Sequence, residues 1–193
     1  MTWHLSAQKK YDYAFFEEAF SDEEIKNIKA FAEKLTPKNA EVSKGDFKAE
    51  EDEKVRKTIL KWINPSADSE HLYRKITDYI LTGNQNWFGY DLTSIESLQY
   101  SIYNIGGFYG KHTDSFHETY EKPRKLSFVI QLTDESEYTG GSTLLWTGAE
   151  PHQIMKKKGS MTLFPSYVLH EVTPIESGTR EAIVGWVQGP AFK

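Results

Sequence analysis

The sequence contains no cysteine. Disulfide bonds and thiolate metal sites are therefore excluded, which leaves histidine, aspartate and glutamate as the strong metal ligands. No apolar run approaches the length of a membrane-spanning helix, and the first residues lack a basic stretch followed by an apolar one. We therefore expect a cytoplasmic protein with no membrane partner. Lysine and arginine form no long cluster, and 23 basic against 28 acidic residues give a net charge of −5, which disfavours nucleic acid as a partner.

The chain does have the length and composition of one globular domain. Its 193 residues are 38% hydrophobic and 14% aromatic, which suits a sizeable core with an aromatic-rich centre or pocket. No internal repeat, low-complexity tract or linker divides the sequence. We therefore predict a single domain over residues 1–193.

The first ninety residues predict mainly helical structure. Residues 11–16 have strand character, and Ser21 and Glu24 form a capping box that begins a helix. This helix should end near Thr36-Pro37, because the residue before a proline disfavours the α conformation.

Residues 38–54 are polar and charged, and we expect a mobile loop there, either a plain surface linker or a lid that gates substrate. Residues 55–63 predict a strand. A second helix is expected over residues 69–82, with Gly83-Asn84 as its C-cap.

From about residue 94 onward the pattern changes to short strands separated by turn residues, which is typical of a β-sandwich or barrel. The predicted strands are residues 95–104, 109–114, 126–133, 142–146, 153–155, 160–164, 170–173 and 181–187. Together with the two helices, they indicate a mainly β fold with flanking helices, of the α+β class.

Residues 99–114 read as a strand, a Gly-Gly turn and a second strand that carries His112 and Asp114. Residues two apart on an extended backbone point to the same face, so the imidazole and the carboxylate converge. They can form two arms of a 2-His-1-carboxylate site, which holds non-haem Fe(II) and leaves open positions. His170 is the candidate third arm. The alternatives are a solvated loop pair for His-x-Asp and an ordinary core histidine for His170.

Arg180 follows His170 by ten residues, the length of a hairpin that returns the chain beside the first strand. An arginine inside an apolar β cavity needs a carboxylate partner, and its planar fork suits one bidentately. Glu181 should point to the opposite face, so a diffusible dicarboxylate would fill this role. The alternative is a surface arginine in a turn.

Three segments, in this order, resemble the Fe(II)/2-oxoglutarate-dependent dioxygenases of the prolyl-4-hydroxylase-like branch. They are residues 98–114 with His-x-Asp, residues 124–141 with Arg-x-x-Ser and Gly-Gly, and residues 159–186 with the later histidine and arginine. The ending is similar to small microbial and phage-encoded members. The resemblance implies a double-stranded β-helix core, of the jelly-roll or cupin-like type, over about residues 94–190, with helical support from residues 17–90.

Carried over by position, the resemblance assigns His112, Asp114 and His170 to the iron. It assigns Arg180 to the C5 carboxylate of 2-oxoglutarate and Tyr103 to a hydroxyl that assists it. No catalytic residue is implied beyond the metal site.

The resemblance also places Tyr109 and Trp186 in the pocket and directs Arg124 towards the substrate. Further candidate contacts with substrate are Arg56, Trp62 and the 38–54 loop. Where some relatives carry serine or threonine two residues after the arginine, this chain has Ala182. The spare histidines His117 and His152 are expected in a loop near substrate and on a surface strand.

The implied reaction hydroxylates an unactivated C–H bond and converts 2-oxoglutarate and O2 to succinate and CO2, with ascorbate as an accessory reductant. The resemblance favours a prolyl residue of a peptide or protein, bound in an extended or polyproline-like conformation. The alternatives are a free amino acid or other small molecule, and a non-catalytic version of the fold that senses 2-oxoglutarate.

Overall fold

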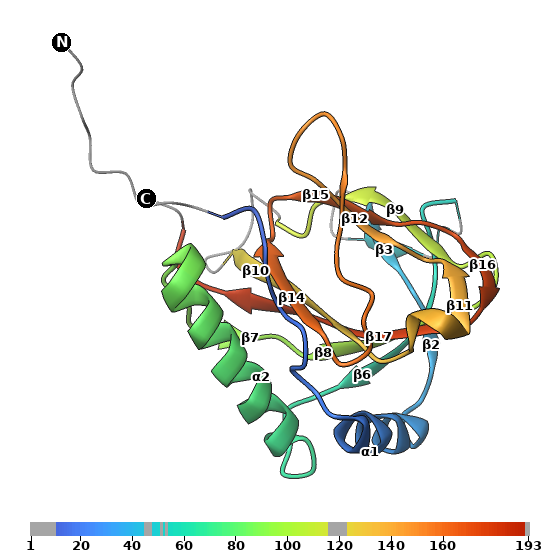
Figure 1. Ribbon diagram of the computed structural model, residues 1–193, viewed down its shortest axis with the longest axis horizontal. Helices are drawn as coiled ribbons and strands as arrows, with labels where there is room; N and C mark the ends of the chain where they lie inside the picture. Colours follow the sequence, from blue (N-terminus) through green and yellow to red (C-terminus); the bar gives the residue numbers. More distant parts are fainter. Residues whose placement is uncertain (1–10, 45–47, 51, 53, 116–122, 192–193) are drawn as a thin grey trace.

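The computed structural model describes residues 11–44, 48–50, 52, 54–115 and 123–191. In this part of the chain, two α-helices lie against a pair of facing β-sheets that form a double-stranded β-helix (Figure 1). The mainly β class with flanking helices is therefore confirmed. Among the described residues, no helix is both long and apolar enough to cross a membrane.

The larger sheet has eight strands in the order β1-β14-β10-β17-β8-β6-β2, with β7 paired to β17. Its strands are β1 (Ala14–Phe16), β2 (Lys38–Asn39), β6 (Ile59–Ile63), β7 (Ser94–Ile95), β8 (Leu98–Tyr103), β10 (Arg124–Gln131), β14 (Met161–Pro165) and β17 (Arg180–Gln188).

The smaller sheet has five strands in the order β13-β12-β15-β9-β5. Its strands are β5 (Arg56–Lys57), β9 (Phe108–His112), β12 (Thr143–Trp146), β13 (His152–Gln153) and β15 (Leu169–Val172). Two short ribbons complete the β structure. They pair β3 (Val42–Lys44) with β4 (Lys48–Glu50), and β11 (Tyr138–Gly140) with β16 (Ile175–Gly178).

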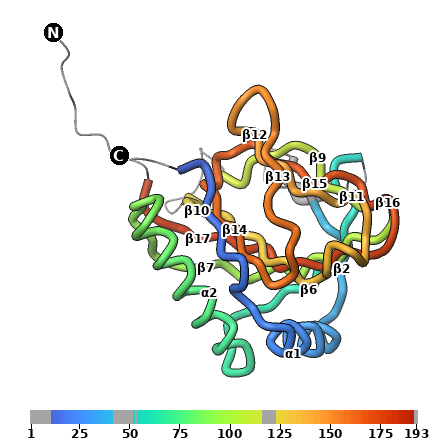
Figure 2. The backbone as a smooth tube through the Cα atoms, viewed as in Figure 1, coloured from blue at the N-terminus to red at the C-terminus, as the bar shows by residue number. Residues whose placement is uncertain are grey.

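Both helices cover the outer face of the larger sheet, α1 (Asp22–Glu33) and α2 (Glu70–Gly83) (Figures 1 and 2). The predicted capping box begins α1, because the Ser21 hydroxyl accepts from the Glu24 amide while the Glu24 carboxylate accepts from the Ser21 amide. Each helix buries an apolar stripe against the sheet. The buried side chains are Ile25, Ile28 and Ala32 of α1, and Leu72, Ile76 and Ile80 of α2.

Alternation along β17 separates the core from the space between the sheets. Ile183 and Val187 belong to the cluster under the helices, whereas Arg180, Val184 and Trp186 line the inner pocket. The inner face of the larger sheet therefore carries the polar side chains that form one wall of the site.

The expected loop over residues 38–54 is wrong in part, because β2, β3 and β4 lie within it. Backbone pairing needs no apolar residues, so a polar segment can add β2 to the edge of the sheet beside β6. Likewise, the strand expected over residues 55–63 is two strands, β5 and β6, which belong to different sheets. The N-terminal third thus supplies strands to both sheets as well as the helices.

The second helix, α2, ends at Gly83 with Asn84 as its C-cap, as expected, and a π-helical turn (Asn84–Phe88) then continues the chain to Gly89. Gly89 has the left-handed φ of 67° that ends the turn. The Asn84 side chain holds this end by accepting from the Tyr90 amide and donating to the Tyr90 carbonyl. Strands β11 and β16 were missed, because these short segments show no apolar alternation.

Candidate metal centre and its pocket

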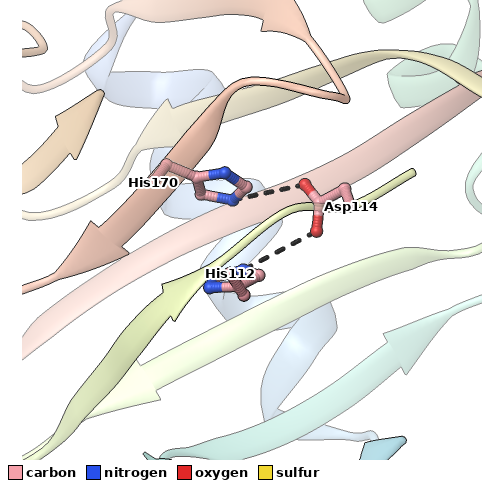
Figure 3. A group of neighbouring side chains, drawn as sticks. All are labelled: His112, Asp114 and His170. Atoms are coloured by element: carbon pink, nitrogen blue, oxygen red, sulfur yellow. Dashed lines mark ion pairs between the residues drawn. The ribbon is translucent and has the colours of Figure 1, made fainter. Parts of the chain in front are cut away.

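Three side chains from neighbouring strands of the smaller sheet converge between the two sheets. His112 ends β9, Asp114 follows two residues later, and His170 lies on β15 directly opposite His112 in the antiparallel register. One ligand atom from each of the three lies within 4.8 Å of the others (Figure 3). The cluster is buried or half-buried, as a site shielded from bulk water requires.

The two imidazoles are oriented by backbone carbonyls. His112 Nδ1 lies 2.8 Å from the Gly110 carbonyl oxygen, and His170 Nδ1 lies 2.8 Å from the Val168 carbonyl oxygen. A proton on each Nδ1 leaves the Nε2 lone pairs facing Asp114, at 3.7 Å and 3.3 Å. Two nitrogens and one oxygen thus point at a common position, as a metal ion requires.

Burial and mutual charge set the protonation of this cluster. Burial, with a smaller contribution from the charge of His170, lowers the pKa of His112 to about 4. Burial also lowers the pKa of His170, but the Asp114 carboxylate outweighs it and the pKa is raised overall. For Asp114, burial raises the pKa, yet both imidazoles and a serine hydroxyl hold it well below its usual range. The carboxylate is therefore ionised and ready to bind a cation.

A pair of serines to which the sequence analysis gave no role holds Asp114 in place, and one of them, Ser127, is the serine of the Arg-x-x-Ser motif. The Ser127 hydroxyl donates to Asp114 Oδ2 at 2.7 Å and lies 3.0 Å from the Ser166 hydroxyl. The Asp114 amide donates to the Ser166 carbonyl at 2.9 Å. Alternation along the strand over residues 126–133 could have placed Ser127 on the inner face, since it alternates with buried apolar residues.

Arg180 lies at the other end of the pocket, 2% exposed. Its guanidinium donates to Gln131 Oε1 and to the Thr143 hydroxyl, at 3.1–3.2 Å. Among the described residues no carboxylate forms an ion pair with it. Glu181 faces outward, where it accepts from Tyr100 and pairs with Lys29, as the alternation predicted. Gln131 and Thr143 were not identified from the sequence.

The walls between the two ends are largely aromatic. The Tyr109 ring stacks on His112 with centroids 3.5 Å apart, and Phe164 meets His170 edge-on at 4.9 Å. Tyr103, whose ring centroid lies 5.3 Å from the Arg180 guanidinium carbon, and Trp186 complete the lining. Ala182 is fully buried in the cluster beneath Phe164 and offers no hydroxyl.

The expected substrate contacts fall in different places. Arg56 lines the pocket. Arg124 does not; it forms a bidentate pair with Glu96 and lies 3.8 Å over the Trp186 ring. Trp62 is 38% exposed on β6, opposite Gln99 and outside the pocket lining.

His117 lies outside the described residues. His152 is exposed against Tyr13, as expected of a surface strand.

The residues present fit an iron ion and a dicarboxylate. Two imidazole nitrogens and one carboxylate oxygen are the donor set of a non-haem Fe(II) centre. Arg180 is a buried cation without a carboxylate among the described residues, and the buried Tyr138 side chain lies beside it. Gly141 packs between these two side chains, and a Cβ there would come within 2.2 Å of Ile175.

Replacing Ser127 with alanine should weaken metal binding without unfolding the protein. The hydroxyl fixes Asp114, and removing such an outer partner typically costs ~10–100-fold in metal affinity. A titration of the apo-protein with Mn(II) measures the effect. Ser101→Ala is the matched control, because Ser101 is equally buried and its hydroxyl has no hydrogen-bond partner within the part of the chain that the structure describes. Equal affinity in the two variants would contradict the positioning role.

The metal affinity should also fall in acid. Below the pKa of His170, which is raised, a metal must displace the proton that Nε2 of the imidazolium holds beside Asp114. The affinity for Mn(II) should therefore be at its full value above that pKa, and fall by ~tenfold per pH unit below it as one proton competes. A series of titrations across this range checks the slope; an affinity independent of pH through the range would contradict it.

Comparison with known proteins agrees with this geometry. Residues 98–188 match the 2OG-Fe(II) oxygenase superfamily. A PKHD-type hydroxylase from Synechococcus sp. (strain CC9605) is 39% identical over 95 residues, which are 49% of this chain and 42% of that protein. A PKHD-type hydroxylase from Psychrobacter sp. (strain PRwf-1) is 33% identical over 94 residues, which are 46% of this chain and 36% of that protein. The matched region thus spans less than half the length of these relatives.

Solved structures share the fold over almost the whole chain. A Pseudomonas putida prolyl-4-hydroxylase has a TM-score of 0.71 and 20% identity, covering 93% of this chain and 94% of that one. A Trichoplax adhaerens prolyl hydroxylase, in complex with a hypoxia inducible factor peptide fragment, has a TM-score of 0.73 and 17% identity, covering 91% and 83%. The resemblance identified from the motifs is confirmed: residues 98–188 match the 2OG-Fe(II) oxygenase superfamily, PKHD-type hydroxylases are among the homologues, and prolyl-4-hydroxylases are among the structural neighbours.

Proposed function

We propose that the protein is an Fe(II)- and 2-oxoglutarate-dependent dioxygenase that hydroxylates an unactivated C–H bond. The observation that carries this proposal is the pairing of two features in one pocket. A cluster of two histidines and one aspartate lies at one end, and the buried Arg180, without a carboxylate partner among the described residues, lies at the other. A dicarboxylate with one end on a metal and the other on Arg180 satisfies both.

In this proposal each end of the pocket has a distinct task. His112, Asp114 and His170 hold Fe(II), which supplies the activation of O2 and the oxidation of the C–H bond when it is bound. Arg180 binds the C5 carboxylate of 2-oxoglutarate, and Tyr103, whose ring lies 5.3 Å from the guanidinium, assists it. Ascorbate is the proposed accessory reductant.

The remaining residues define the shape of the site and exclude water from it. Thr143 and Gln131 hold the Arg180 fork in place, so the arginine is already oriented when the co-substrate arrives. The aromatic walls exclude water and leave little room around the reacting groups. We propose that residues 1–193 act as one domain in this reaction, since strands from both ends of the chain build the same two sheets.

The proposed substrate is a prolyl residue of a peptide or protein in extended conformation. The names of the relatives and structural neighbours support this, since they include prolyl hydroxylases and one complex with a peptide fragment. Trp62 and Trp186 are the proposed contacts for the peptide on the larger sheet. Arg124 acts indirectly, by holding the Trp186 ring through its stacking contact.

Succinate formation tests the reaction. With Fe(II), 2-oxoglutarate and air, proline-containing peptides should stimulate succinate release, and the peptide should gain one oxygen atom in the mass spectrum. Asp114→Ala should abolish both, because the metal loses its anionic ligand. Succinate without any peptide oxidation would discard the prolyl substrate, and iron binding without succinate would discard the enzyme.

Arg180 provides a separate test of the co-substrate site. Arg180→Gln should raise the KM for 2-oxoglutarate by ~100-fold, because truncating one partner of a buried charge pair costs a few kcal/mol. Arg74→Gln is the control, since Arg74 is an exposed arginine paired with Glu70 on α2. Steady-state kinetics measure the change. An unaltered KM in a folded Arg180→Gln protein would place the co-substrate elsewhere.

A further inference from the structure

The pocket contains a second buried arginine. Arg56 lies on β5, directly across from Tyr109 on β9, and its side chain faces the same interior. It is 6% exposed, and its guanidinium carbon lies 4.4 Å over the Tyr109 ring. Since Tyr109 itself stacks on His112, Arg56 is one aromatic ring away from the candidate metal ligands.

Arg56 has too few partners for a buried cation. Within the described residues its side chain makes one hydrogen bond, from Nη2 to Gln99 Oε1 at 3.1 Å, and Nε is buried with no acceptor. No carboxylate of these residues forms an ion pair with it. An amide and an aromatic ring cannot neutralise a guanidinium. The buried positive charge of Arg56 is therefore not balanced by these partners, and an anion would stabilise it.

A second orphaned donor lies in the same pocket. Trp186 Nε1 is buried, and no acceptor for it lies among the described residues. The register pairs Val184 with Gln99, so Trp186, two residues further on the same face, is the diagonal neighbour of the glutamine that Arg56 contacts. Arg56 Nε and Trp186 Nε1 are both hydrogen-bond donors, and both require acceptor oxygens. One carboxylate presents such oxygens and a negative charge together.

The charged side chains that line the pocket lead to the same conclusion. Among the described residues of this lining, two arginines, Arg56 and Arg180, accompany one carboxylate, that of Asp114. This arrangement of charges favours anionic ligands in the pocket.

We propose that Arg56 binds a carboxylate of the primary substrate, with Trp186 Nε1 as an additional donor. This inference rests on the proposed function and narrows its substrate class to anionic molecules. The carboxylate has two sources, a terminal α-carboxylate next to the reacting residue or an acidic side chain beside it. The fork of Arg56 meets its oxygens, and the reacting carbon is thereby directed towards the histidine cluster.

Binding to the loaded but unreactive protein tests the proposal. The protein is saturated with Mn(II) and 2-oxoglutarate without O2, and dissociation constants are measured by calorimetry for two matched pairs of probes. One pair is N-acetyl-L-proline and N-acetyl-L-prolinamide. The other is a capped pentapeptide with an internal proline followed by glutamate, and its glutamine counterpart. The first pair reports a terminal carboxylate and the second an acidic side chain.

The wild-type protein should bind the acidic member of at least one pair ~10-fold more tightly or better. Arg56→Gln should remove this preference and leave the neutral probe within about threefold of its wild-type affinity. Arg56→Lys should retain part of the preference, and Arg74→Gln, the surface control, all of it. Melting temperatures confirm that each variant is folded.

Three results would overturn the proposal. In the first, the wild-type protein binds the acidic and the neutral probe equally well, or binds neither. In the second, the preference for the acidic probe persists in Arg56→Gln. In the third, Arg56→Gln loses affinity for both probes to the same extent. The last would mean that Arg56 only supports the Tyr109 ring. Failure of the proposed function is distinguishable, because it appears earlier, as a wild-type protein that does not bind 2-oxoglutarate in the presence of Mn(II).

Discussion

The antiparallel pairing of β9 with β15 is the interaction on which the candidate site depends. Its register sets His170 opposite His112 and brings the two rings to a centroid distance of 4.1 Å. A shift of one residue would turn either histidine to the outside of the smaller sheet. Asp114 has its own anchor beyond the end of β9, because its amide donates to the Ser166 carbonyl. The three candidate ligand side chains are thus placed by backbone hydrogen bonds of the described residues.

Around this cluster the protein buries polar groups in two different ways. Some are satisfied by their neighbours, as Asp114 is by Ser127, and these groups hold the site in shape. Others are left incomplete, and they lie where ligands are proposed to bind. Among the described residues, Arg180 donates to an amide oxygen and a hydroxyl, and Arg56 donates to one amide oxygen while its Nε has no acceptor. Buried donors without acceptors are destabilising in the free protein, and a bound anion would remove that penalty.

The helices, most strands and the pairing of His112 with Asp114 could be predicted from the sequence because each rests on a local period, whereas the family resemblance assigned His170 to the same site. The two-residue spacing of His112 and Asp114 is such a case. What could not be predicted depends on long-range pairing. Nothing local shows that the strand over residues 55–63 is divided between the two sheets, which is what brings Arg56 to Tyr109. The partners of Arg180 on β10 and β12 likewise come from 37 to 49 residues away.

The most direct test of the central claim is an anaerobic absorption titration of the Fe(II)-loaded protein with 2-oxoglutarate. If the histidine cluster holds the iron and Arg180 fixes the far carboxylate, a charge-transfer band of the chelated 2-oxo acid should appear and saturate at one equivalent. The band should be absent in Asp114→Ala and need a much higher 2-oxoglutarate concentration in Arg180→Gln. A wild-type protein that binds iron yet shows no band would contradict the claim.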